Sequence, residues 1–274
     1  PGKNVFITGN PGIGKTVATK HVLKELEETS DEVFPIYVNG WRKNTPYKIL
    51  LEICEIINYK FTQNKKVEDL FEAILPILNK KAIVLCLDEA DKIKEIDILY
   101  SFLEDVYNKS IILITNEKSW LDKLDTRIKS RLTPEILEFK PYNLQETEGI
   151  IKQRIEYAFI PNVFNNEALK KIANKTFELK DLRTGMYLLK ESGDAAESRE
   201  SRKIELADVE KALEKLNKFK IKDKDDLNSE QSSLLNLIEK NPNKSTTELH
   251  ELFNLNISYK SFRRKLDDLS KAKL

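Results

Sequence analysis

The chain has 274 residues, which exceeds the usual size of a single domain and favours two or three packed units. Hydrophobic residues make up 40% of it and charged residues 33%, a composition that excludes a disordered or fibrous chain. The net charge of +1 favours no partner by itself, so any affinity for nucleic acid needs a local basic face.

Cys54 and Cys86 both lie within apolar runs, LLEICEII and AIVLCLDE. This placement predicts two buried thiols in a reducing compartment rather than a disulfide. No apolar run approaches the ~20 residues that span a bilayer, and no secretory leader opens the chain, so we expect a cytoplasmic protein. The chain begins at Pro1 without an initiator Met, and we expect that some upstream sequence has been lost.

Short apolar runs alternate with helical patterns over the first half of the chain. We expect strands at 4–9, 34–39, 82–88, 110–116 and 135–139, and helices at 15–28, 46–58, 67–79 and 96–108. Such alternation predicts βαβ units around a parallel sheet whose strands are covered on both faces. The fold class is therefore α/β, with a doubly wound parallel sheet in a nucleotide-binding domain at 1–142.

The sequence GNPGIGKT lies between the first expected strand and the first expected helix, and it matches the phosphate-binding pattern G-x-x-x-x-G-K-[ST]. Glycines allow the backbone to wrap phosphates with its N–H groups, and the helix directs its positive end at them. Lys15 would reach the outer phosphates of ATP or ADP, and Thr16 would hold Mg²⁺. The expected nucleotide contacts are Gly9, Asn10, Pro11, Gly12, Ile13, Gly14, Lys15, Thr16 and Val17.

Carboxylates follow the third expected strand, in IVLCLDEAD. We assign Asp88 to the metal shell and Glu89 to the polarisation of the attacking water. Asn116 ends the next strand, IILITN, where its amide would orient the same water. The structural alternatives are a helix N-cap for Asp88 and Glu89, and a turn residue for Asn116.

The string DEAD at 88–91 also occurs in helicases, but a helicase of that class needs a second α/β domain, and residues 143–216 have a helical pattern. Guanine specificity would require N-K-x-D, which TNEKS does not provide. ATP is therefore the expected nucleotide.

The strands end after Pro141, and apolar residues then recur at helical spacing. We expect an all-helical lid domain at 143–217, and a charged linker at 218–227, for which a continuation of the preceding helix is the alternative. Three short helices are expected in the final domain, 228–274, beginning near Ser229, Thr246 and Ser258.

Taken together, these motifs resemble the archaeal origin-recognition and replication-initiator branch of the AAA+ ATPases. The resemblance covers nearly the whole chain, through GNPGIGKT, VNGWRKNTPYKILLEI, LCLDEAD, ITNEKSWLDKLDTRIKSRL, FKPYNLQETEGIIKQRI, DLRTGMYLL and ISYKSFRRKLDDL. The narrowest of these is R-[IV]-x-S-R followed by a strand and F-x-P-Y-N, because the other nucleotide motifs occur in many families.

This resemblance implies further site residues. Arg131, with Arg127 as an additional candidate, would act as an arginine finger on the ATP of a neighbouring subunit, and a surface arginine in a charged helix is the alternative. Arg183 matches the sensor-two arginine of the lid, and Tyr142, in FKPYN, joins the nucleotide contacts. The family usually has Gly before Asp-x-Arg, whereas this chain has Lys180.

The terminal segment resembles a winged-helix DNA-binding domain that stops where the wing would begin. Phe262, Leu266 and Leu269 would share an apolar helical face, opposite a basic one. Residues 258–274 contain six Lys or Arg against two Asp, and a solvated basic helix is the alternative. The expected DNA contacts are Tyr259, Lys260, Ser261, Arg263 and Arg264.

We therefore expect a slow, regulatory ATPase that binds origin DNA at the nucleoid and promotes helicase loading. Its expected partners are double-stranded DNA, a replicative helicase or other initiator subunits, and a second copy bridged by ATP. Two rival functions share parts of this pattern. A clamp-loader-like or remodelling AAA+ machine would not need the basic helix. A signalling P-loop NTPase, whose terminal helices bind protein or regulate transcription, would lack an arginine finger working between subunits.

Overall fold

The structure is a computed structural model that describes residues 2–225, 233–234, 236–238, 241, 244–253 and 257–271, without the side chains of 218–225 and 267–271. Its contacts divide the chain into two compact units. The first comprises Pro1–Pro161 and Leu169–Leu189, and the second comprises Asn162–Ala168 and Lys190–Leu274. Among the described residues, no helix combines the length and the apolar character that crossing a membrane requires.

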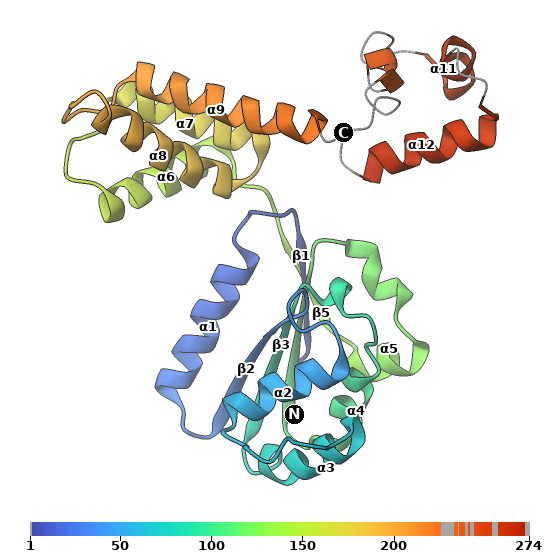
Figure 1. Cartoon of the computed structure of the whole chain (residues 1–274). Coiled ribbons are helices and arrows are strands. Elements are labelled where there is room, and N and C mark those ends of the chain that lie inside the picture. The colour runs from blue at the N-terminus through green and yellow to red at the C-terminus, as the bar shows by residue number, and fades with distance from the viewer. Residues whose placement is uncertain are drawn as a thin grey trace. The chain divides into compact units, whose positions relative to one another are not determined.

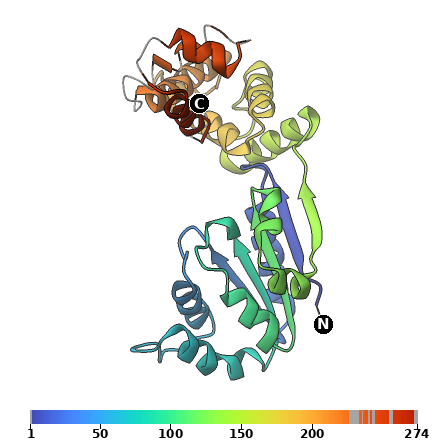
Figure 2. The ribbon, with the colours of Figure 1, turned by 90° about the vertical axis from the view of Figure 1, so that its right-hand side faces the viewer.

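A parallel sheet of five strands lies at the centre of the first unit, in the order β2-β3-β4-β1-β5 (Figures 1 and 2). The strands are β1 (Val5–Gly9), β2 (Val33–Asn39), β3 (Ala82–Asp88), β4 (Lys109–Thr115) and β5 (Glu135–Phe139). All adjacent pairs are parallel. The doubly wound sheet predicted from the sequence is therefore confirmed, including its fifth strand.

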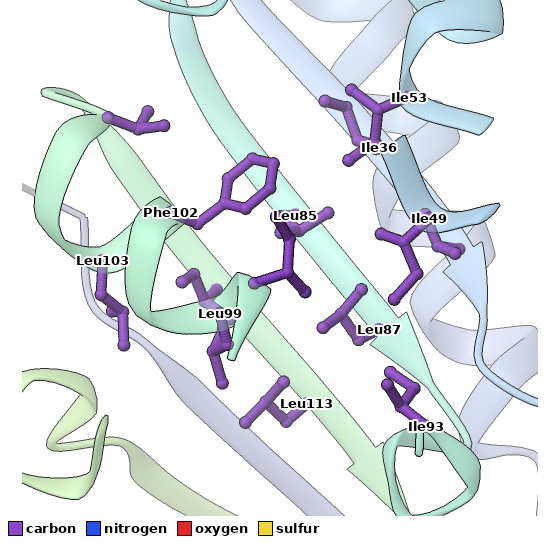
Figure 3. Packing of buried hydrophobic residues seen from close by; sticks show 14 of the residues in the cluster. Ile36, Ile49, Ile53, Leu85, Leu87, Ile93, Leu99, Phe102, Leu103 and Leu113 are labelled. Atoms are coloured by element: carbon purple, nitrogen blue, oxygen red, sulfur yellow. The ribbon is translucent and has the colours of Figure 1, made fainter. Parts of the chain in front are cut away.

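Helices cover both faces of this sheet (Figure 1). Helix α1 (Lys15–Thr29) packs on one face through Leu23, beside Ile7, Cys86 and Ile114. The opposite face carries a larger apolar cluster, to which α2 (Pro46–Ile56), α3 (Val67–Leu78), α4 (Ile98–Asp105) and α5 (Thr126–Leu132) contribute. Figure 3 shows part of that cluster, with Leu85 and Leu87 of β3 between residues of α2 and α4.

The strand residues alternate between the two clusters because successive side chains in a strand point to opposite faces. Leu85 and Leu87 belong to the larger cluster, while Val84 and Cys86 belong to the cluster under α1. Asp88 therefore emerges on the α1 side, at the end of β3. Cys54 and Cys86 are both buried free thiols, as the sequence predicted.

The predicted helical region after Pro141 is also confirmed. It contains α6 (Leu144–Ala158), α7 (Asn166–Leu179), α8 (Leu182–Glu197) and α9 (Leu206–Asp225). Residues 218–225 continue α9, which was the alternative to an irregular linker, and 226–227 lie outside the described residues. The two compact units do not follow the boundary expected at 142/143, which stays a prediction.

In the final segment, the structure places α11 (Thr246–Leu252) and α12 (Tyr259–Lys271) where helices were expected. Ser245 caps α11 by accepting a hydrogen bond from Glu248 N, and the Glu248 carboxylate accepts one from Ser245 N. Leu249, Phe253 and Phe262 form a small buried core with Leu234. The expected helix start at Ser229 lies outside the described residues.

Candidate nucleotide site

The loop from Gly9 to Gly14 joins β1 to α1 in a conformation that needs glycine. Gly12 and Gly14 have φ values of 78° and 94°, and Gly14 is the N-cap of α1. These angles lie in the left-handed region, which L-residues with a side chain rarely adopt. A Cβ on Gly12 would also lie 1.9 Å from Oδ1 of Asp181. The loop ends at the N-terminus of α1, where backbone N–H groups favour the binding of anions.

Lys15 is 7% exposed and makes three hydrogen bonds. Its ammonium donates to the carbonyl of Gly9 at 2.7 Å, to that of Asn10 at 2.9 Å and to Oδ1 of Asn116 at 2.7 Å. Burial lowers the pKa of Lys15, Asp88 offsets part of this effect, and the charge of Arg183 lowers the pKa further. A buried cation at this position favours a bound anion, because the opposite charge would compensate for the hydration that burial removes.

Asp88 is 2% exposed and accepts hydrogen bonds on both of its carboxylate oxygens. Thr16 Oγ1 and the Tyr37 hydroxyl each donate to Oδ2 at 2.7 Å, and the backbone N–H of Glu89 donates to Oδ1 at 2.9 Å. The structure thus brings together the two residues expected to hold Mg²⁺, Thr16 and Asp88.

These oxygen donors fit magnesium. In nucleotide sites, Mg²⁺ is held by one or two carboxylates or hydroxyls together with phosphates and waters. The Thr16 hydroxyl uses its proton on Asp88, which leaves its lone pairs for a cation. No group of three or more His, Cys, Asp or Glu that could hold a metal occurs within the described part of the chain. The pair formed by Thr16 and Asp88 does not need such a group, because phosphates and waters complete the shell of Mg²⁺ in nucleotide sites.

Glu89 follows Asp88 with a φ of 52°, in the left-handed region. Such a conformation costs about 1–3 kcal/mol outside glycine and tends to occur where function requires it. The side chain is half-buried and lines the same cavity as Lys15 and Thr16. Glu89 therefore lies at the cavity for which the sequence predicts a catalytic base, and its role as that base stays a prediction.

A cavity of about 670 Å³ lies over these residues, and all of its lining belongs to the first unit. This volume is typical of small-molecule sites. Of the residues expected from the sequence, the cavity is lined by Gly12, Gly14, Lys15, Thr16, Val17, Asp88, Glu89, Asn116, Tyr142 and Arg183. The other four expected residues do not line the cavity. Gly9 and Asn10 accept hydrogen bonds from Lys15 through their carbonyls. Pro11 is exposed, and Ile13 is buried.

The start of α8 reaches the phosphate-binding loop directly. Leu182 N donates to the carbonyl of Gly12 at 3.2 Å, and Arg183, next in sequence, lines the cavity. Arg183 N donates to Oδ1 of Asp181 at 2.9 Å. Lys180 has a φ of 52°, so it adopts the left-handed conformation that a glycine would favour. The helix start is therefore retained despite the lysine.

Arg131 does not line this cavity. It lies on α5, where its Nε donates to Glu104 and its guanidinium lies 4.9 Å from the centre of the Tyr100 ring. Arg127 lies over the same ring at 5.8 Å and pairs with Asp125. Neither arginine joins the chain's own nucleotide site, so a role as a finger would have to be exerted on another molecule.

The basic residues of α12 are separated from its apolar side. Phe262 is fully buried and Leu266 is partly buried, whereas Lys260, Arg263 and Arg264 are exposed. Tyr259 is 41% exposed and Ser261 is half-buried. The side chain of Leu269 lies outside the described residues.

Two parts of the site were not predicted from the sequence, the face contributed by α6 and the hydrogen bond made by Tyr37. Ile150, Gln153 and Arg154 line the cavity from one face of α6. Their i, i+3 and i+4 spacing was a usable signal, but it predicts only a common face and not what that face meets. The other lining residues that were missed are Ala18, His21, Ile114, Thr115, Leu182 and Met186.

Two protein-family models match this sequence. The model described as an AAA domain matches residues 2–120, and the one described as the Cdc6 AAA+ ATPase-type lid domain matches residues 148–214.

Curated relatives are named as replication proteins. The ORC1-type DNA replication protein 1 of Sulfurisphaera tokodaii is 36% identical over 222 residues, which are 76% of this chain and 56% of that protein. The ORC1-type DNA replication protein 2 of Archaeoglobus fulgidus is 29% identical over 284 residues, 99% of this chain and 75% of that protein. The chain thus spans a little over half the length of relatives such as the first.

Solved structures share the fold. The Aeropyrum pernix ORC1 protein in complex with DNA has a TM-score of 0.73 and 24% identity, covering 100% of this chain and 78% of that one. The Aeropyrum pernix ORC2 protein in its ADPNP-ADP complexes has a TM-score of 0.73 and 18% identity, covering 99% of this chain and 80% of that one.

Proposed function

Because the chain belongs to the AAA+ ATPase family of the ORC1-type and Cdc6 replication proteins, we propose that it is an ATP-dependent initiator of DNA replication. In this role it binds ATP with Mg²⁺, hydrolyses it slowly, binds origin DNA at the nucleoid and promotes helicase loading. Whether ATP or ADP is bound governs the binding of DNA or the loading of the helicase.

One observation carries the nucleotide part of this proposal. Segments far apart in the sequence line one cavity of about 670 Å³, among them the phosphate-binding loop, the ends of β3 and β4, and the start of α8. A phosphate-binding lysine, a carboxylate pair, an amide and a lid arginine are the groups that phosphoryl transfer to water requires.

Each group has a distinct role. Lys15 and Arg183 bind the negative charge of the outer phosphates. Thr16 and Asp88 would hold Mg²⁺, which would neutralise part of that charge. Glu89 accepts a proton from the attacking water, and Asn116 orients that water. The reaction is slow when the cavity lacks the additional cation that a neighbouring Arg131 supplies.

The DNA part of the proposal rests on α12. Lys260, Arg263 and Arg264 are exposed on a helix whose opposite side is buried, so the charges can approach phosphates without exposing the core. The ORC1 protein of Aeropyrum pernix, which shares this fold, has been solved in complex with DNA. We assign Tyr259, Lys260, Ser261, Arg263 and Arg264 to the contact with DNA.

Fluorescence anisotropy with labelled duplexes tests this proposal. Replacing both Arg263 and Arg264 with Ala should weaken binding and flatten the salt slope by about one unit for each DNA phosphate that the variant no longer binds. The control replaces Lys170 and Lys171, which are exposed on α7, and should leave the affinity unchanged. Equal DNA affinity of the Arg263/Arg264 variant and the unmodified chain, with nucleotide binding intact in both, would favour another AAA+ machine.

A further inference from the structure

Tyr37 is a partly buried polar contact of Asp88 that comes from a strand with no sequence motif. It lies on β2 in register with Cys86 of β3, so both side chains emerge on the face covered by α1. Asp88 follows two residues after Cys86 on the same face, and this alternation brings the phenol hydroxyl to Oδ2 of Asp88 at 2.7 Å.

The hydrogen bonds of Asp88 leave little freedom to its carboxylate. An ionised carboxylate has about four acceptor positions. The protein fills two on Oδ2, from Thr16 and Tyr37, and one on Oδ1, from Glu89 N. The remaining acceptor position lies on Oδ1, which is the oxygen left for the hydration shell of a metal ion.

The two hydroxyls have different consequences for a metal. Thr16 is itself an expected metal ligand, so its hydrogen bond to Asp88 links one ligand to another. Tyr37 lies one strand away and donates to the same oxygen from a different direction. Terminal torsions of Asp side chains are broad, so the plane of the Asp88 carboxylate depends on its hydrogen-bond donors. Glu89 N holds Oδ1, Thr16 and Tyr37 hold Oδ2, and Tyr37 is the side-chain donor of these three that is not itself an expected metal ligand.

The position of Tyr37 is itself well supported. Its ring packs in the cluster beneath α1 with Ile7 and Leu23, and Lys20 Nζ lies 4.3 Å from the ring centroid. Burial, together with the hydrogen bond to Asp88, raises the pKa of the Tyr37 hydroxyl far above its ordinary value.

We propose that Tyr37 is a positioning residue for the magnesium of the nucleotide, because its hydroxyl fixes the rotation of the Asp88 carboxylate that faces the metal shell. Tyr37 is not among the residues that line the cavity, so in this proposal it acts on the metal through Asp88. This inference rests on the proposed function as a Mg-ATP site.

The test is Tyr37→Phe, which removes one oxygen atom and keeps the ring under Lys20. The affinity for ADP and for a non-hydrolysable ATP analogue is measured by calorimetry in EDTA and over a series of free Mg²⁺ concentrations. Loss of an outer-shell partner typically weakens metal binding by about 10- to 100-fold. We expect the free Mg²⁺ concentration that gives half of the increase in nucleotide affinity to rise at least tenfold. The nucleotide affinity in EDTA should change by less than about twofold.

Tyr107→Phe is the matched control, because it deletes the same hydroxyl from a side chain that is 78% exposed on the α4–β4 loop. Asp88→Asn is the positive reference, in which the Mg²⁺ effect should be lost. Thermal unfolding of all variants in EDTA shows whether the fold is retained. A merely structural role for Tyr37 would change that unfolding and not the Mg²⁺ requirement.

Two results would overturn this inference and leave the proposed function standing. In one, Tyr37→Phe has the same Mg²⁺ requirement as Tyr107→Phe. In the other, Tyr37→Phe lowers nucleotide affinity equally with and without Mg²⁺, which would make Tyr37 a support of the phosphate-binding loop. If the unmodified chain binds nucleotide with no dependence on Mg²⁺, the proposed metal site and this inference are both wrong.

Discussion

The ammonium of Lys15 donates a hydrogen bond of 2.7 Å to Oδ1 of Asn116, a residue 101 positions further along the chain. The contact is possible because β1 and β4 are adjacent and parallel, so the loop after one strand lies beside the end of the other. It joins the expected phosphate-binding residue to the residue expected to orient water. The following predictions depend on this convergence.

Replacing Lys15 with Ala should abolish most nucleotide binding and keep the fold. Hydrogen bonds to charged groups contribute about 1.5–3 kcal/mol each, so removing one bond to phosphate weakens binding about 10- to 100-fold. Calorimetry measures the affinity, and Lys24→Ala, an exposed change further along α1, is the control. Unchanged affinity in a folded sample would place the nucleotide elsewhere.

Glu89→Gln should separate binding from hydrolysis. The amide keeps the shape of the side chain but cannot accept the proton of the attacking water, and loss of a general base costs about 10²- to 10⁴-fold in rate. Phosphate release should fall by that factor while nucleotide affinity remains within a few fold. Glu95→Gln, at an exposed position in the same loop region, should leave the rate unchanged. Hydrolysis near the unmodified rate in Glu89→Gln would leave Glu89 with a structural role only.

Arg131 should complete the site of another molecule, because in its own chain it contacts Glu104 and Tyr100 outside the cavity. Arg131→Ala should lower hydrolysis steeply, since arginine fingers contribute about 10³- to 10⁵-fold. Mixing Arg131→Ala with Lys15→Ala should restore part of the rate, because each variant supplies the group that the other lacks.

Arg127→Ala serves as the comparison in the same assay, since Arg127 lies over the same Tyr100 ring. A defect and rescue confined to Arg127→Ala would make Arg127 the finger. If the mixed variants associate in analytical ultracentrifugation but hydrolysis is not restored, action between subunits is ruled out for Arg131.

Lys180→Gly should stabilise the protein. Lys180 has a φ of 52°, and the left-handed conformation costs a residue with a Cβ about 1 kcal/mol or more. Glycine also increases the entropy of the unfolded chain, and this effect offsets about 0.4–1 kcal/mol of the stability gained by removing the strain. We expect a net gain of about 0.5 kcal/mol, seen as a higher urea midpoint.

Lys171→Gly is the matched control, because it makes the same substitution at an exposed position inside α7. Glycine in a helix interior costs about 1 kcal/mol, so the midpoint should fall. If both substitutions lower the midpoint, the strain at Lys180 is smaller than its angle indicates.

Several features could be determined from the sequence because they depend on neighbours in the chain. The strands were recognisable from continuous apolar runs, which parallel strands need when both faces are covered. The glycines at 12 and 14 and Lys15 were recognisable because the phosphate-binding loop is a local structure with fixed spacing. Asp88 and Asn116 could be expected at one site because Asp88 ends β3, Asn116 directly follows β4, and the ends of adjacent parallel strands meet at one edge.

Other features depend on the order of the strands and on the docking of helices, which local spacing does not specify. The order β2-β3-β4-β1-β5 places Tyr37 beside Asp88, and no pattern in FPIYVN predicts that contact. The left-handed angle at Lys180 is invisible in the sequence, because lysine does not favour it. The contact of Arg131 with Glu104 joins α5 to α4, and it forms only because both helices pack on one face of the sheet. Hydrogen bonds between segments far apart in the chain require the tertiary structure, since they depend on distances that only packing establishes.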